Sequence, residues 1–341
     1  MLNRLIHVSL LALIGSVALA AEAQVQRTPW GTPEFSGVWS NASLTQLTRD
    51  RGVDKLVVTE NEAQEIIAAR GGLRADKTWN KAQYSNPEAG APEKGDDDFG
   101  VKGYDSFWLA SGDTFARVKG ELRSSYIVDP PSGQAPYIDP AKVQKEQRQR
   151  ASDYALGNAD YDGPEATTIA ERCLIGFSNT GGPGMLSAGY NNNYQFVQTQ
   201  DHLMILVEMA HDARIIPIFD TAQRARASHK PAAITPWLGD SVAWWEGDTL
   251  VAETTGVNEK QGSVSAFRIS PTGKVTERFT RLNNTEVFYE FIVDDPVYYT
   301  KPWKAELSFH PQSRVYEYAC HEGNYGLEGI LLGARLNERK K

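Results

Sequence analysis

The stretch from Trp237 to Gly256, WLGDSVAWWEGDTLVAETTG, limits the possible folds more than any other part of the chain. It predicts two strands, residues 241–245 and 250–254, joined by a tight turn at Gly247-Asp248, because glycine readily takes the positive φ that such a turn requires. One face of this hairpin would carry the side chains of Ser241, Ala243, Trp245, Leu250, Ala252 and Thr254. The opposite face is then expected to meet water or salt-bridge partners.

The rest of the second half predicts more strands of the same kind. From Tyr190 onward, turn signals recur roughly every ten residues, and the expected strands are 194–199, 203–209, 215–219, 274–282, 286–293, 304–310 and 314–320. Short strands at this spacing are typical of a sandwich or a closed barrel. We expect a mostly β fold with an antiparallel, lipocalin- or calycin-like β-barrel, and a C-terminal helix over 327–339 that packs across one barrel end.

The first half is less regular. Residues 24–170 are expected to form an N-terminal extension of mixed helix and strand, part of the same unit as a barrel core at 171–341. The elements expected in it are, in order, a strand near 35–39, a helix at 60–70, a polar surface excursion at 76–103, two strands within 106–128 and a helix at 142–154.

Composition narrows the classes of partner. With 341 residues, of which 41% are hydrophobic, the chain can bury a full core without a disulfide scaffold. A formal net charge of -8 argues against a nucleic-acid partner, since phosphate binding draws on clustered Lys and Arg. The glycine-rich stretch 176–189 lacks the spacing of a phosphate-binding loop. A small-molecule ligand is therefore the expected partner, and the oligomeric state stays open.

The N-terminus predicts export. Arg4 precedes an apolar run at 8–20, and small residues follow at the spacing expected of a signal-peptidase site. We therefore expect a signal peptide at 1–23, cleaved after Ala20 or Ala23, and a periplasmic or secreted mature protein. No later stretch is apolar enough to span a bilayer, and no cysteine follows either cleavage point, so no membrane anchor is expected.

The chain has two cysteines, Cys173 and Cys320. In an oxidising compartment, one long-range disulfide between them is the first expectation. Two buried free thiols are the alternative. A catalytic thiolate is less expected, even beside His321, because neighbours on a strand point to opposite faces.

Three polar clusters stand where strands are expected to end. The first is Glu208, His211, Asp212 and Arg214. Glu208 would share a strand face with apolar side chains, where desolvation raises the pKa of a carboxyl toward the range of a general acid or base. The alternative is an ion pair between Glu208 and Arg214. No metal site is predicted, because Glu208-x-x-His211 would need a helix and further carboxylates.

The second cluster is His321, Glu322 and Asn324, after the last expected strand. At a barrel mouth these groups would meet the first cluster, and His321 would carry a proton near neutral pH. The alternative is a hydrogen-bonded corner in which His321 holds backbone carbonyls.

The third cluster is Asp240 and Ser241, with Trp237 and Trp245 nearby. A serine nucleophile is not predicted, since the second glycine and the following helix of a nucleophile elbow are missing. The tryptophans would either stack on a flat ligand or pack in the core. We expect the Asp240-Ser241 end of the hairpin to contact the His321 corner.

Several of these motifs together resemble a family of uncharacterised exported bacterial proteins. The likeness covers most of the mature chain and includes WxGDSxxxWEGDTLVxET from Trp237, Tyr190-Asn191-Asn192, Arg172-Cys173, Glu277-Arg278-Phe279 and EYxCHEGN from Glu317. The chain departs from the family at Ala243-Trp244, where glycine and a basic residue are usual, so no role for a basic side chain carries over there. The resemblance implies that the polar residues of these motifs, Tyr190 and Asn192 among them, belong to one site.

These observations give two hypotheses of function. The first is a lyase or hydrolase without a cofactor, acting on a small organic or glycosidic substrate, in which Glu208 and His321 transfer protons and His211 and Glu322 orient them. Arg214 would steer an anionic group, and the remaining substrate contacts would be Asp240, Ser241, Trp245, Tyr190, Asn192 and Asn324. The second is a periplasmic binding protein that holds an apolar ligand inside the barrel without catalysis.

Overall fold

The computed structural model describes residues 25–70, 112–156, 163–263 and 266–339. The expected signal peptide at 1–23 and the expected excursion at 76–103 lie outside these residues. None of the described helices has the length and apolarity needed to cross a bilayer.

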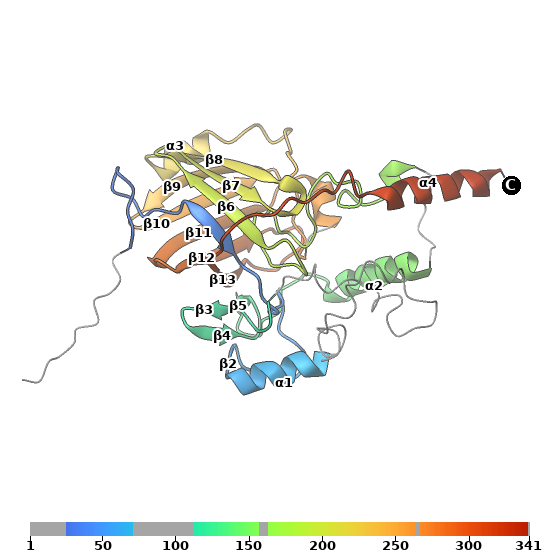
Figure 1. Cartoon of the computed structure of the whole chain (residues 1–341), viewed down its shortest axis with the longest axis horizontal. Helices are drawn as coiled ribbons and strands as arrows, with labels where there is room; N and C mark the ends of the chain where they lie inside the picture. The colour runs from blue at the N-terminus through green and yellow to red at the C-terminus, as the bar shows by residue number, and fades with distance from the viewer. Residues whose placement is uncertain (1–24, 71–111, 157–162, 264–265, 340–341) are drawn as a thin grey trace, which may run out of the picture.

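The described residues form a closed nine-stranded β-barrel (Figure 1). Its strands, in chain order, are β1 (Gly37–Ser40), β6 (Asn193–Gln198), β7 (His202–Val207), β8 (Ala213–Phe219), β9 (Asp240–Glu246), β10 (Thr249–Thr255), β11 (Lys274–Asn283), β12 (Glu286–Asp294) and β13 (Trp303–Pro311). Each strand pairs with the next, and β1 closes the ring by pairing with both β6 and β13. The expected barrel is confirmed.

The barrel is mixed, which corrects the expectation of a purely antiparallel one. Strands β8 and β9 run parallel, whereas the other neighbouring barrel strands run antiparallel. A parallel connection needs a crossover, and the short helix α3 (Ala222–Ala227) lies in the segment that provides it. Thr221 caps this helix by accepting a hydrogen bond from the Arg224 N–H.

The N-terminal segment contributes to the barrel and also forms a small layer beside it. Strand β1 comes from this segment, so the barrel is not confined to 171–341. A three-stranded sheet packs with α1 (Glu60–Arg70) at one side of the barrel (Figure 1). Its strands are β2 (Val57–Val58), β3 (Arg117–Val118) and β4 (Glu121–Arg123), while β5 (Ile127–Asp129) pairs with β13. The other helical elements before β6 are α2 (Pro140–Leu156) and η5 (Pro164–Ala166).

The hairpin predicted at 237–256 is present as β9 and β10. Trp245 faces Leu250 across the ladder, and Gly247 in the turn has φ 60°. Ala243, Leu250 and Ala252 face the main core as expected. The outer face is less exposed to solvent than expected, because α3 covers it and buries Val242, Trp244 and Val251. The charged partners expected on that face do occur, with Arg226 on Glu253 and Arg278 on Glu246.

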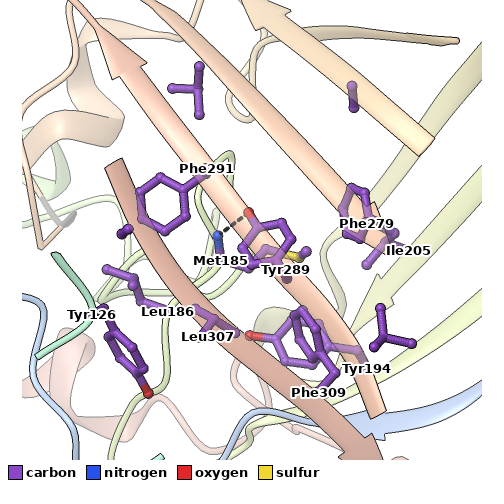
Figure 2. Close-up of a cluster of buried hydrophobic side chains, with 14 of the residues drawn as sticks. Tyr126, Met185, Leu186, Tyr194, Ile205, Phe279, Tyr289, Phe291, Leu307 and Phe309 are labelled. Carbon is purple, nitrogen blue, oxygen red and sulfur yellow. Dashed lines mark hydrogen bonds between the residues drawn. The ribbon is translucent and has the colours of Figure 1, made fainter. Parts of the chain in front are cut away.

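Aromatic side chains fill the barrel interior (Figure 2). Inward positions on β6, β11, β12 and β13 carry Phe196, Phe279, Tyr289, Phe291 and Phe309, all at most 1% exposed. Their rings meet edge-on or tilted, with centroids 5.0 Å apart for Phe279 and Tyr289 and 5.5 Å apart for Tyr289 and Phe309. The interior is therefore a packed core.

The chain after β13 differs from expectation. No strand forms at 314–320, because β13 already pairs with β12 on one side and with β1 and β5 on the other. Residues 312–324 instead cross the surface, held by hydrogen bonds from Gln312 N to Val38 O (2.9 Å) and from Tyr316 N to Glu208 Oε2 (3.0 Å). Helix α4 (Tyr325–Glu338) follows as predicted, but it extends away from the barrel (Figure 1) and none of its residues is buried.

A disulfide between Cys173 and Cys320 ties this C-terminal segment to the loop before β6. The expected pairing is confirmed, with a Cα–Cα distance of 5.8 Å. It closes a loop over a sequence separation of 147 residues. Cross-linking of this kind restricts the unfolded chain more as the loop grows longer.

Replacing both cysteines by alanine is expected to lower the free energy of unfolding by roughly 4–5 kcal/mol, the loop-closure value for a loop of this length. Urea denaturation of the oxidised wild type and the Cys173→Ala/Cys320→Ala variant measures the difference. A loss below about 1 kcal/mol would contradict the loop-closure argument.

Candidate functional site

A cavity of about 460 Å³ opens where β8 and β9 separate. The two parallel strands pair only at Ile218 with Ala243 and Phe219 with Trp244. The residues that precede these pairs in β8 and β9 are not paired with each other. The cavity occupies this unpaired part of the barrel wall. It is lined by Leu174, Ile175, Asp212, Ala213, Arg214, Ile215, Pro217, Phe219, Ser228, Lys230, Pro236, Trp237, Leu238, Gly239, Asp240, Ser241 and Val242.

The turn that leads into β9 forms one wall of the cavity. Gly239 has φ +74°, and a Cβ on it would lie 2.6 Å from the Thr254 methyl group and 2.9 Å from the Thr255 carbonyl oxygen. A larger residue would therefore clash with β10 as well as strain the backbone. Glycine at this position lets Trp237 and Leu238 lie against the cavity.

Asp212 is the carboxyl group in this cavity that is best placed to exchange a proton. Burial raises its pKa to about 6, although its Oδ2 accepts a hydrogen bond of 2.9 Å from the Gly176 N–H. The pKa stays high because the opposing hydrogen bond is weaker than the cost of desolvating the charge. A carboxyl with this pKa is ionised near neutral pH yet remains basic enough to accept a proton.

Arg214 reaches from the cavity wall into the barrel, where it forms an ion pair with Glu277. Its Nη1 lies 2.9 Å from Glu277 Oε1, and its Nη2 donates to Oε2. Tyr289 Oη donates to Glu277 Oε1 (2.6 Å), and the Gly184 N–H donates to the same oxygen (3.1 Å). Burial alone would raise the pKa of Glu277, but Arg214 holds it below its ordinary value. The expected alternative pairing of Arg214 with Glu208 is therefore wrong.

Ser241 lies on the cavity side of this ion pair. Its Oγ accepts a hydrogen bond from Arg214 Nη2 (3.1 Å) and shares another with Thr254 Oγ1 (2.8 Å). Arg214 Nη2 also donates to Thr254 Oγ1 at 3.3 Å. The hydroxyl of Ser241 thus belongs both to the cavity surface and to the buried charge network.

Asp240, the next cavity residue, is held in a cluster of charges near the C-terminal end of α3. Its Oδ2 lies 2.9 Å from His229 Nδ1 and accepts from the Lys230 N–H (2.9 Å), and its Oδ1 pairs with Lys230 Nζ. Glu253 lies 3.7 Å from His229 Nε2 and binds Arg226 Nε at 3.1 Å. Two carboxylates therefore flank one histidine.

Glu208 lies apart from the cavity, at the end of β7 where the turn η6 (Met209–His211) begins. Its Oε1 accepts from Asn191 Nδ2 (2.8 Å), and its Oε2 accepts from Asn193 Nδ2 (2.6 Å) and the Tyr316 N–H (3.0 Å). Glu208 is only 3% exposed, and its carboxylate oxygens are occupied by these hydrogen bonds. This arrangement fits an anchor for the C-terminal segment.

The remaining predicted site residues are scattered. His211, His321 and Glu322 are exposed, and the His211 ring lies 6.4 Å from that of Tyr318. Asn324 caps α4 and donates to the Glu171 carbonyl (2.6 Å), while Asn192 holds the Ala188 backbone through two hydrogen bonds. The other two make aromatic contacts, Tyr190 with Phe177 and Trp245 with Phe35.

Of the site predicted from sequence, the structure therefore brings Arg214, Asp240 and Ser241 to one cavity. In the described ranges, no hydrogen bond or ion pair joins His321 to Glu208, Asp240 or Ser241. These ranges also contain no group of three or more His, Cys, Asp or Glu side chains placed to hold a metal ion.

The sequence named Asp212 in the first cluster and Glu277 among the motif residues without giving either a role, and it did not single out Tyr289. A signal for Glu277 existed, because it stands between Val275 and Phe279 at alternate positions of a strand and so shares their inward face. The loop at 174–181, whose Gly176 N–H binds Asp212, could not be placed from the sequence.

Removing one partner of the buried pair is expected to destabilise the protein more than removing both. Glu277→Leu leaves the Arg214 charge buried and should cost about 3–5 kcal/mol of unfolding free energy. The double variant Arg214→Met/Glu277→Leu should cost clearly less, because no uncompensated charge remains. Urea denaturation of the three proteins checks this, and a double variant as unstable as the single one would contradict it.

His229 is expected to make stability depend on pH. Its contacts with Glu253 and Asp240 raise the pKa of the imidazole against the effect of burial. Because the raised pKa belongs to the folded state, the stabilisation is complete below the unfolded value of about 6.5 and is lost as pH rises through the folded value.

The unfolding free energies of wild type and His229→Gln should therefore differ most in mildly acidic buffer and converge in alkaline buffer. The pKa values of Asp240 and Glu253 lie below their ordinary values in the folded protein, so both carboxylates stay ionised across this range. A difference that grows with rising pH would contradict the assignment.

Comparison of the chain with family models, with curated proteins and with solved structures gave no match.

Proposed function

We propose that the protein is an exported enzyme that performs acid–base chemistry on a small organic molecule bound in the cavity between β8 and β9. Asp212 is the proton-transfer group in this proposal, and the reaction is of the lyase or hydrolase type. The observation that carries the proposal is a carboxyl with a pKa of about 6 facing a cavity of about 460 Å³. A general base with a pKa near the working pH combines adequate basicity with the ionised form.

The residues around Asp212 have the composition of a small-molecule binding site. Apolar side chains of Ile175, Trp237 and Leu238 share the lining with a few polar groups, the combination typical of small-molecule sites. The polar groups are held by ion pairs, Arg214 by the buried Glu277 and Asp240 by the exposed Lys230. Fixed polar groups orient a ligand at little cost in conformational entropy.

This proposal moves the chemistry away from Glu208 and His321, the pair expected from the sequence. Glu208 is enclosed by three hydrogen-bond donors, and His321 lies on the surface. The alternative, an apolar ligand inside the barrel, has less support because aromatic rings occupy the interior positions. The expected signal peptide and the disulfide between Cys173 and Cys320 both support export to an oxidising compartment.

Asp212→Asn is expected to lower kcat/KM by at least about 100-fold, because it removes the proton acceptor and keeps the shape. The assay incubates wild type and variants with mixtures of small carbonyl compounds, esters and glycosides and follows each compound by mass spectrometry. Wild-type kcat/KM should rise with pH through about 6, since Asp212 must be ionised to accept a proton.

Asp220→Asn is the matched control, because Asp220 is an exposed aspartate paired with Arg224. It should retain wild-type turnover, as should His321→Ala. Full activity in Asp212→Asn, or a loss in His321→Ala comparable to that expected for Asp212→Asn, would contradict the assignment of the proton-transfer group.

A further inference from the structure

We propose that the Ser241 hydroxyl donates a hydrogen bond into the cavity and selects a neutral carbonyl compound with a compact apolar body. This inference deepens the proposed function and rests on its cavity. The ligand class follows from the direction of the Ser241 hydrogen bond, the apolar walls of the cavity and the charges that line it.

The direction of the hydroxyl protons follows from burial. Thr254 is 0% exposed, so its O–H must donate to a protein acceptor. Its Oγ1 has two described polar neighbours, Arg214 Nη2, which only donates, and Ser241 Oγ. Thr254 therefore donates to Ser241.

Ser241 Oγ then accepts from both Thr254 and Arg214. Its own proton has no acceptor within this network, and the side chain is half-buried at the cavity surface. The proton is thus free to point toward a bound molecule. A hydroxyl that accepts from a guanidinium is polarised, which makes it a stronger donor.

The charge balance of the cavity favours a neutral acceptor. Glu277 compensates Arg214, and Asp240 compensates Lys230. Asp212 adds a negative charge near neutral pH, so a ligand carboxylate would meet repulsion without an unpaired cation to offset it. A ketone, aldehyde, ester or amide oxygen meets the Ser241 donor without this cost.

The remaining walls define the rest of the ligand. Leu174, Ile175, Trp237 and Leu238 offer an apolar surface large enough for one or two rings within about 460 Å³. A ring system that carries a carbonyl group therefore matches both parts of the cavity.

The test uses two soluble probes of similar shape, 4-hydroxyacetophenone and 4-isopropylphenol, which differ in the carbonyl oxygen. Their dissociation constants for the full mature protein are measured by NMR titration, with backbone assignments locating the bound probe. One neutral hydrogen bond corresponds to roughly 1 kcal/mol, so the ketone should bind about fivefold more tightly. The carboxylate 4-hydroxybenzoate should bind more weakly than the ketone.

Ser241→Ala should abolish the preference for the ketone, whereas Ser228→Ala should retain it. Ser228 also lines the cavity, but its hydroxyl donates to the Ala225 carbonyl (2.6 Å) and so is already engaged. A preference that survives Ser241→Ala, tighter binding of the carboxylate, or no shift at cavity residues with any probe would overturn the inference.

The two proposals fail separately. If Ser241→Ala removes the preference while Asp212→Asn leaves turnover unchanged, the ligand class stands and the catalytic proposal fails. If Asp212→Asn abolishes turnover while the ketone preference survives Ser241→Ala, the catalytic proposal stands and the ligand class fails.

Discussion

The ion pair between Arg214 and Glu277 constrains three strands and a loop of the barrel at once. It joins β8 to β11 inside an aromatic core, and its hydrogen bonds extend to Tyr289 on β12 and to the loop at 182–185. A charged pair in such surroundings is tolerated only when its polar atoms find partners. The neighbouring loop must therefore approach closely, and Gly182 permits this, since a Cβ there would lie 2.6 Å from Arg214 Nη1.

The cavity forms at the parallel junction of the barrel. Strands β8 and β9 pair over only two residue positions, and the gap above these positions is where Arg214 meets Ser241. A continuous antiparallel wall would have left no space between the strands. The crossover through α3 thus produces both the break in the wall and the cluster of His229, Asp240 and Glu253 that supports its rim.

Much of the barrel could be predicted because its strands carry local signals. Alternating apolar and polar residues, together with turn residues, indicate the hairpins β6–β7, β9–β10 and β11–β12. The strand expected at 314–320 carried similar side chains, yet a closed barrel had no free edge to pair with it. Closure, like the parallel junction, depends on contacts between distant segments, which a local pattern does not encode.

The candidate site was harder to predict for the same reason. Arg214, Asp240 and Ser241 could be selected from residue type and position, but their partners could not. The expectation for Glu208 assumed that a carboxylate on an apolar strand end lacks hydrogen-bond donors, whereas Asn191 and Asn193 supply them from one segment and the Tyr316 N–H from another. Asp212 has its raised pKa because distant loops bury it, and loop packing leaves no periodic trace in a sequence.

The position of β1 in the ring has a consequence for the order in which the molecule can assemble. This strand is the first of the barrel to leave the ribosome, and both of its partners, β6 and β13, follow much later. Until β13 arrives, the growing sheet keeps two open edges, and an open edge is a template for pairing with other chains. Ring closure is thus a late event, and the nascent chain must stay unaggregated until its last strand is available.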